Sequence, residues 1–369
     1  MLLASFQELL GYIGYVLLSI LVLLLMITVH EAGHYFAGKI LGFGVEEFSI
    51  GFGPKIFSKK KKNGEIFSVR LIPFGGYCAF TGEDKEDDNE NAFNNKSPWK
   101  RIIVLISGAF MNYILALVII FTMFGIYGQT AYVPVKMNYN EIYTTENSLN
   151  EKDVIIRADN KNIYLITDAI SVLSGKQKDE TVNFTVIRNG KTTDINVTLR
   201  ETADFKNMED VQKLYDVLGI YYSVSGEEIT ETGLYATSVR FSFFETVGRG
   251  VEYSFKLAGT IFTVLGQLLT GRIGLSSMGG TVTTIAVTAN AIRQGGLRYL
   301  LYISSFIGVN LAVFNLLPIP ALDGSRVVFT LIEWIRKKPI SRKAEGIIHV
   351  VGFALILCFA VFVDLQHCF

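Results

Sequence analysis

The chain has 369 residues, of which 50% are hydrophobic and only 18% are charged. This composition is typical of membrane proteins and argues against an ordinary soluble domain. The 34 basic side chains are balanced by 34 acidic ones, and this zero net charge argues against a nucleic-acid-binding surface, so no nucleic-acid partner is expected.

The first predicted element is an uncharged run, 11–29, which is close to the roughly 20 residues that a helix needs to cross a bilayer. It is followed at once by the sequence HEAGH. Residues four apart share one face of a helix, so His30 and His34 can bind a single metal ion. In this arrangement zinc takes the two histidines and the glutamate handles the proton of the attacking water, which predicts Glu31 as the general base. A chance motif with packed histidines is the alternative, but a carboxylate at the end of a span costs about 2.5–3.5 kcal/mol and needs a partner.

Three further uncharged stretches, 102–128, 299–322 and 346–363, are long enough to cross a bilayer, so four transmembrane helices are predicted. Lys and Arg are concentrated between spans one and two and between spans three and four, whereas neither short terminus carries either residue. By the positive-inside rule both of these loops are cytoplasmic and both termini are extracytoplasmic. The HEAGH motif is therefore expected at the cytoplasmic end of the first span.

The segment between spans two and three is predicted to lie outside and to form a small domain over 129–240. Apolar and polar residues alternate in 181–187 and again in 195–199, and the intervening Asn189-Gly190 predicts a β-hairpin. A short helix is expected over 168–173. A mere spacer is the alternative interpretation of this segment.

Residues 241–298 are predicted to lie at the membrane interface. Their uncharged part, 257–271, has only about 15 residues, which is too short for a comfortable span. Lys256 and Arg272 border it, as expected for an interfacial helix.

A catalytic zinc site usually has three protein ligands, so the two histidines need a third partner. His349 in span four and His367 at the C-terminus are poor candidates. Span three ends in NLLPIPALDG, where two prolines break the helix and Asp323 lies at the same cytoplasmic end as HEAGH. Asp323 is therefore the predicted third ligand.

These motifs, in this order and topology, make the sequence similar to a known family. HEAGH in span one, NLLPIPALDG in span three and the exported domain between them resemble the site-2 protease family of intramembrane zinc metalloproteases. The similarity is greatest to the bacterial branch that includes the regulator of sigma-E protease. FSIGFGPK at 48–55, IPFGGY at 72–77 and the 94–101 stretch leading to Gly108 and Asn112 also resemble that branch, so the resemblance covers most of the chain.

The resemblance implies a polytopic α-helical membrane protein with four transmembrane helices, a membrane re-entrant β-hairpin and an inserted small α/β PDZ-like extracytoplasmic domain. It places the protein in the bacterial plasma or inner membrane, with its active site near the cytoplasmic side. The expected parts are an N-terminal membrane part (1–128) with a cytoplasmic re-entrant hairpin (64–81), the PDZ-like domain (129–240), the interfacial region (241–298) and a C-terminal membrane part (299–369).

The resemblance also implies roles for individual residues. His30, His34 and Asp323 match the family's ligands for one catalytic zinc ion, and Glu31 matches its general base. The stretch 66–80 matches a hairpin that takes the substrate as an added strand, a mode in which main-chain hydrogen bonds give affinity. For Asn315 and Asn112, hydrogen bonding between helices is about as probable as a role in catalysis. The residues expected to contact substrate are Asn315, Asn112, Ile66, Phe67, Ser68, Val69, Gly75 and Gly76.

The sequence departs from the family pattern in the exported domain. Residues 148–155 resemble the Gly-Leu-x-x-Gly-Asp-x-Ile stretch of PDZ domains, but Ser148 and Lys152 replace both glycines. No clear carboxylate-binding loop is present either. We therefore expect this domain to exclude bulky ectodomains rather than to capture a free C-terminus.

The combined prediction is an intramembrane zinc metalloprotease that cleaves single-span membrane proteins, such as anti-sigma factors, and also leftover signal peptides. A catalytically silent homologue that only binds membrane helices is one alternative, but it would lack part of the site, and all four expected residues are present. A metal transporter is the other alternative, but it would normally show internal repeats and a polar path through several helices. The sequence predicts no oligomeric state.

Overall fold

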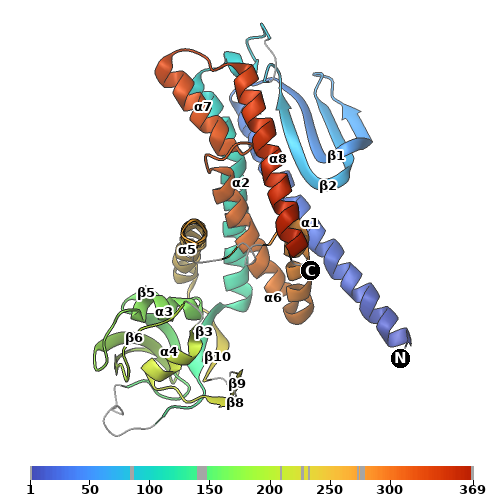
Figure 1. Cartoon of the computed structure of the whole chain (residues 1–369). Coiled ribbons are helices and arrows are strands. Elements are labelled where there is room, and N and C mark those ends of the chain that lie inside the picture. Colours follow the sequence, from blue (N-terminus) through green and yellow to red (C-terminus); the bar gives the residue numbers. More distant parts are fainter. Residues whose placement is uncertain are drawn as a thin grey trace. The chain divides into compact units, whose positions relative to one another are not determined.

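The computed structural model describes residues 2–83, 87–138, 148–207, 210–225, 228–231, 233–271, 274 and 279–366, so His367 lies outside the described residues. The chain divides into two compact units (Figure 1). Unit 1 consists of Met1–Thr122 and Ser254–Phe369, and unit 2 consists of Met123–Tyr253.

Four helices have the length and apolar composition of membrane spans, with mean hydropathies between 1.5 and 2.7. This confirms the prediction of a polytopic helical membrane protein. The four are α1 (Leu2–Ile40), α2 (Pro98–Tyr127), α6 (Thr281–Asn315) and α8 (Arg342–Gln366). The remaining helices outside the core of unit 2 are the single turn η1 (Phe93–Asn95), α5 (Phe243–Leu269) and α7 (Asp323–Arg336).

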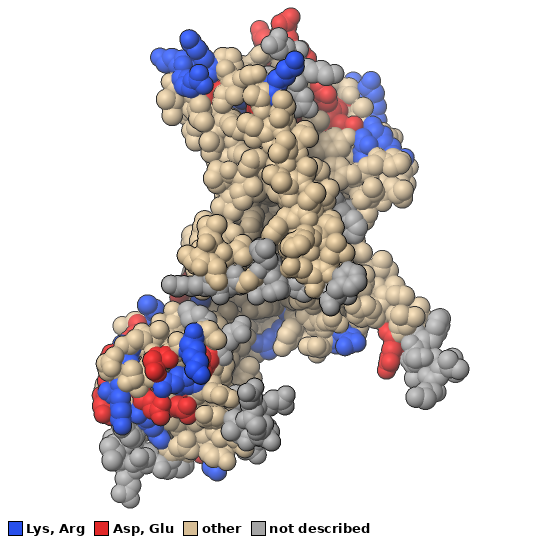
Figure 2. All heavy atoms as spheres, viewed as in Figure 1, with Lys and Arg blue, Asp and Glu red and all other residues tan. Residues whose placement is uncertain are grey.

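The outer surfaces of the long helices are apolar. On α8, Val350, Leu355 and Val361 are each more than half exposed. Figure 2 shows a broad uncharged belt over the helices of unit 1, with basic and acidic side chains gathered at the end where α7 lies. Exposed apolar surface on this scale is typical of helices that face lipid.

Helix α6 begins earlier than the third span expected from the sequence. Residues 281–298, which the sequence placed at the interface, are helical and continue into the span across a kink at Gly296, where φ is 59° and ψ is −143°. The uncharged run begins only at residue 299 because Arg293 and Arg298 precede it. The helix includes both arginines, so the start of the uncharged run does not mark the start of the helix.

Helix α6 also ends earlier than expected, at Asn315 instead of residue 322. Pro318 and Pro320 follow, and neither can donate the backbone hydrogen bond that a helix requires. The chain therefore leaves the helix over 316–322 and starts α7 at Asp323.

A β-sheet in unit 1 contains more than the hairpin expected at 64–81. It is built from two long bent strands, β1 (Val45–Lys60) and β2 (Ile66–Phe80). Residues 66–69 pair with 47–50 on one side and with 57–60 on the other, whereas 72–80 pair only with residues of the 45–52 segment in the described chain. Residues 66–69 are thus interior to the sheet, and 72–80 form its edge.

Unit 2 is an inserted β domain. Its largest sheet has the strand order β10-β3-β4-β6-β7, with β5 paired to β4, and a separate two-stranded sheet joins β8 and β9. The strands are β3 (Gln129–Pro134), β4 (Val154–Ala158), β5 (Lys161–Asn162), β6 (Thr181–Arg188), β7 (Lys191–Thr198), β8 (Ser223–Ser225), β9 (Glu228–Glu231) and β10 (Leu234–Val239). The helices are α3 (Ile166–Leu173) and α4 (Val211–Leu218).

Local predictions in this unit are confirmed. The hairpin of β6 and β7 turns at Asn189 and Gly190, which both have positive φ, as a two-residue type I′ turn requires. Val182, Phe184 and Val186 alternate into the core from β6. Helix α3 covers the expected 168–173 stretch.

Lys152 stands where the PDZ pattern has a glycine, and its backbone adopts a conformation that favours glycine. Lys152 has a φ of 68°, a left-handed conformation that costs a non-glycine residue about 1–2 kcal/mol. The next residue, Asp153, is buried and accepts a hydrogen bond from the Asn150 backbone N–H at 2.8 Å. Its carboxylate also accepts two hydrogen bonds from Arg188, at 2.7 and 2.8 Å, and these contacts hold the loop in the strained turn.

Candidate metal centre

Three predicted ligands converge in unit 1. His30 and His34 lie one turn apart on α1, and Asp323 is the first residue of α7. The Asp323 Oδ2 atom lies 3.1 Å from His30 Nε2 and 3.3 Å from His34 Nε2, and the two Nε2 atoms are 3.1 Å apart. Ligands bound to one tetrahedral zinc at 2.0–2.1 Å would lie roughly 3.3–3.4 Å apart, so the three atoms have the spacing of a zinc site.

The other ring nitrogen of each histidine has a partner that orients the imidazole. His34 Nδ1 lies 2.8 Å from the Val104 carbonyl oxygen on α2 and donates its proton there, which leaves Nε2 as the metal ligand. His30 Nδ1 lies 3.4 Å from the side-chain amide of Asn315, the last residue of α6, and the amide atom placed there is Nδ2. When His30 Nε2 is the ligand, Nδ1 carries the proton, so the amide oxygen of Asn315 must face it.

This pattern leaves three electron-rich atoms pointing at one another. With both Nδ1 atoms protonated, the two Nε2 atoms carry lone pairs, and the buried Asp323 Oδ2 makes no hydrogen bond among the described residues. A bound cation is the group that makes this arrangement favourable, and two histidines with one carboxylate form a donor set typical of catalytic zinc.

Two glycines allow the helices to approach closely at the site. A Cβ atom on Gly108 of α2 would lie 2.4 Å from His34 Nε2 and 2.8 Å from His30 Cε1. A Cβ atom on Gly33 of α1 would lie 2.4 Å from the carbonyl oxygen of Ser107. The sequence suggested a resemblance at Gly108 but assigned it no role, although its spacing of four from Asn112 places both on one helix face.

Contacts on α7 and α8 fix the position of Asp323. Arg326, one turn after Asp323, forms an ion pair with Glu83, which raises the pKa of the guanidinium group. The backbone N–H of Ala321 donates a hydrogen bond to His349 Nδ1 at 3.1 Å. His349 is thus a neighbour of the ligand loop rather than a fourth ligand.

A cavity of about 300 Å³ opens beside the three ligands. Glu31, Gly75, Gly76, Asn112 and Asn315 all line it. Asn112 is fully buried, and neither its amide nitrogen nor its amide oxygen has a partner among the described residues. The predicted contacts Ile66, Phe67, Ser68 and Val69 do not line this cavity, because they are interior to the sheet.

The family model described as Peptidase family M50 matches residues 18–359 of the chain. The chain belongs to this family. Among its relatives, a predicted zinc metalloprotease of Clostridium perfringens is 32% identical over 361 residues, which cover 95% of this chain and 98% of the relative. A predicted zinc metalloprotease of Fusobacterium nucleatum is 32% identical over 359 residues, covering 95% and 97%. Zinc metalloprotease RasP of Geobacillus kaustophilus is 26% identical over 431 residues, covering 93% and 96%.

The M50 assignment confirms the predicted family, enzyme class and cofactor. The protein is a zinc metalloprotease of family M50, and the candidate metal site is His30, His34 and Asp323. Val104, Gly108 and Gly33 are contacts at this M50 site to which the sequence assigned no role. Each of these residues contacts the opposite helix of the α1–α2 pair. Such a contact leaves no local sequence pattern beyond the small side chains of the two glycines.

Replacing Gly108 by alanine should weaken zinc binding by the M50 protease. The new methyl group has no room beside His34 Nε2, so the imidazole must turn away from its ligating position. We expect at least the roughly 10–100-fold loss of affinity seen when metal ligands are misoriented. Competition with a chromophoric chelator measures this, and Gly125→Ala on the same helix, where a Cβ meets nothing within 4 Å, is the matched control. Unchanged zinc affinity in Gly108→Ala would contradict the packing described.

Replacing Asn315 by leucine should also lower zinc affinity, by about 10–100-fold, because the variant removes the acceptor that orients His30. Asn310→Leu is the control, since the Asn310 amide donates to the Phe306 carbonyl oxygen of its own helix at 2.8 Å and makes no other side-chain hydrogen bond among the described residues. The same chelator competition applies. If Asn315 contacts only substrate, its replacement will change cleavage but leave zinc affinity as in the wild type.

Proposed function

We propose that this M50 protease cleaves peptide bonds inside the transmembrane segments of single-span membrane proteins. The observation that carries the proposal is the placement of the metal site on the spans themselves. His30 and His34 lie within candidate span α1, and Asp323 follows the end of candidate span α6 by only eight residues. A substrate segment that reaches this site must enter the apolar surroundings of the spans, so it must itself be apolar.

Zinc held by His30, His34 and Asp323 would supply a Lewis acid for activating water and polarising a peptide carbonyl. The Glu31 side chain lines the same cavity, beside the ligands, so its carboxylate is placed to accept the proton of that water. Glu31 then returns the proton to the leaving amine. The unpaired amide of Asn112 is available to hydrogen-bond the substrate backbone, which also satisfies its own buried polar atoms.

The substrate must unwind, because a transmembrane helix uses its own carbonyls in internal hydrogen bonds. The edge of the sheet at 72–80 offers an alternative set of backbone partners, since it pairs on one side only in the described chain. Gly75 and Gly76 of this edge line the cavity together with Glu31. A substrate strand added at 72–80 would therefore present its backbone to the site. Residues 66–69 cannot accept such a strand, because they already pair with a neighbouring segment on each side.

The family resemblance supports anti-sigma factors already trimmed outside the membrane, and leftover signal peptides, as substrates. The distribution of Lys and Arg between the spans supports a bacterial inner-membrane protein with extracytoplasmic termini and an active site near the cytoplasmic side. Unit 2 would then lie outside and exclude substrates with bulky ectodomains.

Reconstituted vesicles that contain the protease and a single-span substrate test this proposal. Two substrates are compared, one with an all-leucine span and one whose span carries Asn and Gly near the cytoplasmic end. The proposal predicts faster cleavage of the second, because its helix unwinds at lower cost. Cleavage only outside the span in both substrates would overturn the proposal, and equal cleavage within the two spans would contradict the requirement for unwinding.

A further inference from the structure

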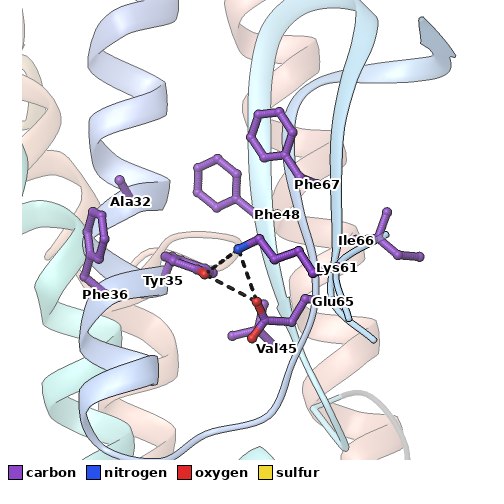
Figure 3. Close-up of a pocket in the computed structure, with 9 residues that line it drawn as sticks. All are labelled: Ala32, Tyr35, Phe36, Val45, Phe48, Lys61, Glu65, Ile66 and Phe67. Atoms are coloured by element: carbon purple, nitrogen blue, oxygen red, sulfur yellow. Dashed lines mark hydrogen bonds and ion pairs between the residues drawn. The ribbon is translucent and has the colours of Figure 1, made fainter. Parts of the chain in front are cut away.

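A second cavity lies on another face of α1, away from the metal ligands. It has a volume of about 180 Å³ and lies between α1 and the β1–β2 sheet (Figure 3). Tyr35 extends from α1 toward Lys61 and Glu65 (Figure 3), and Phe36 of the same helix also lines the cavity. Its apolar wall consists of Ala32, Phe36, Val45, Phe48, Ile66 and Phe67.

One end of this cavity is polar and carries an excess of positive charge. Lys61 Nζ donates to the Tyr35 hydroxyl at 2.9 Å and to Glu65 Oε2 at 3.3 Å (Figure 3). Lys39 forms an ion pair with the same carboxylate, so two ammonium groups share one buried anion. The exposed Lys59 pairs in register with Phe67, which places it on the cavity's face of the sheet, and it has no ion pair among the described residues.

The apolar end opens toward the surface that lipid would cover. Phe36, which lines the cavity, is 56% exposed. An apolar wall that ends at the Lys61 ammonium group matches the order of acyl chain and phosphate in a phospholipid. Basic pockets beside transmembrane helices on the cytoplasmic side are suited to anionic lipid headgroups.

We propose that this cavity is a binding site for an anionic phospholipid. Part of an acyl chain lies against the apolar wall, and the phosphate lies between Lys59 and Lys61. The ring of Phe48 packs against Tyr35 with centroids 5.5 Å apart, so a lipid here would brace the β1–β2 sheet against α1, the helix that carries His30 and His34. This proposal requires that unit 1 is embedded in a membrane, but it does not depend on which substrate the protease cleaves.

Native mass spectrometry of the full-length protein in detergent tests the site with phosphatidylglycerol, with phosphatidylcholine of the same chains, and with glycerol 3-phosphate. Phosphatidylglycerol should be retained in preference to phosphatidylcholine. Because each lysine near an anionic lipid contributes a factor of roughly five, the K59Q/K61Q variant should bind phosphatidylglycerol roughly thirtyfold more weakly. The K338Q/K343Q variant, which removes two lysines from the other basic loop, should bind it as the wild type does.

A second variant separates lipid binding from folding. Phe36→Ser keeps every lysine and changes a side chain that is already half exposed, so it should weaken retention of the lipid without altering zinc content. Equal retention of the two lipids would overturn the proposal, as would unchanged binding in both K59Q/K61Q and Phe36→Ser. Displacement of the lipid by equimolar glycerol 3-phosphate would also overturn it, because the site would then bind the phosphate alone.

Discussion

Replacing Glu31 by glutamine is expected to lower the cleavage rate by about 10²–10⁴-fold, the usual contribution of a general base. Glutamine keeps the shape of the side chain in the cavity but cannot accept a proton at neutral pH. Glu31 is not one of the three convergent metal ligands, so zinc content should stay at the wild-type level. The measurement is the initial rate of cleavage of a single-span substrate, with zinc determined by inductively coupled plasma mass spectrometry on the same sample.

Glu46→Gln is the matched control, because it removes a carboxylate from an exposed position on β1. Its cleavage rate should equal that of the wild type. Normal cleavage by Glu31→Gln would contradict the role assigned to Glu31. No cleavage by the wild-type protein under any condition, with zinc bound, would favour the catalytically silent alternative.

Replacing Asp323 by alanine is expected to remove most of the bound zinc. Only the two histidines of α1 remain as ligands in that variant, and their Nε2 atoms lose the anion that balances the metal charge. The loss of affinity should exceed the roughly 10–100-fold effect of an outer-shell partner. Chelator competition on the purified protein measures this, and cleavage should be lost in parallel.

Asp88→Ala, at an exposed position of the loop after β2, controls for the loss of an aspartate. The thermal unfolding midpoint of both variants in detergent shows whether the fold is kept. Wild-type zinc affinity in Asp323→Ala would remove Asp323 from the ligand set. A folded variant that has lost both zinc and activity would agree with the geometry.

The central features of the site could be predicted because they depend on local sequence. HEAGH places two imidazoles on one helix face by the helical repeat alone, and the prolines of NLLPIPALDG end a span just before Asp323. The turn at Asn189-Gly190 was predictable for the same reason, since it requires positive φ at two adjacent residues. These signals involve residues close together in sequence.

Contacts between distant segments could not be predicted in this way. The Val104 carbonyl that orients His34 lies 70 residues away, and the Asn315 amide next to His30 lies 285 residues away. A backbone carbonyl has no sequence signature at all. The edge at 72–80 was also hidden, because only the pairing with β1 shows that 66–69 are interior to the sheet and 72–80 form its edge.

The most direct test of an intramembrane protease is the position of the cut bond. Purified protein is reconstituted with a single-span substrate, and the fragments are sequenced by mass spectrometry before zinc removal, after chelation, and after zinc is restored. We expect a cut within the hydrophobic span that disappears on chelation, returns with zinc and is absent in Glu31→Gln. A cut confined to the water-exposed flanks of the span, or one that persists at the same rate in Glu31→Gln, would contradict it.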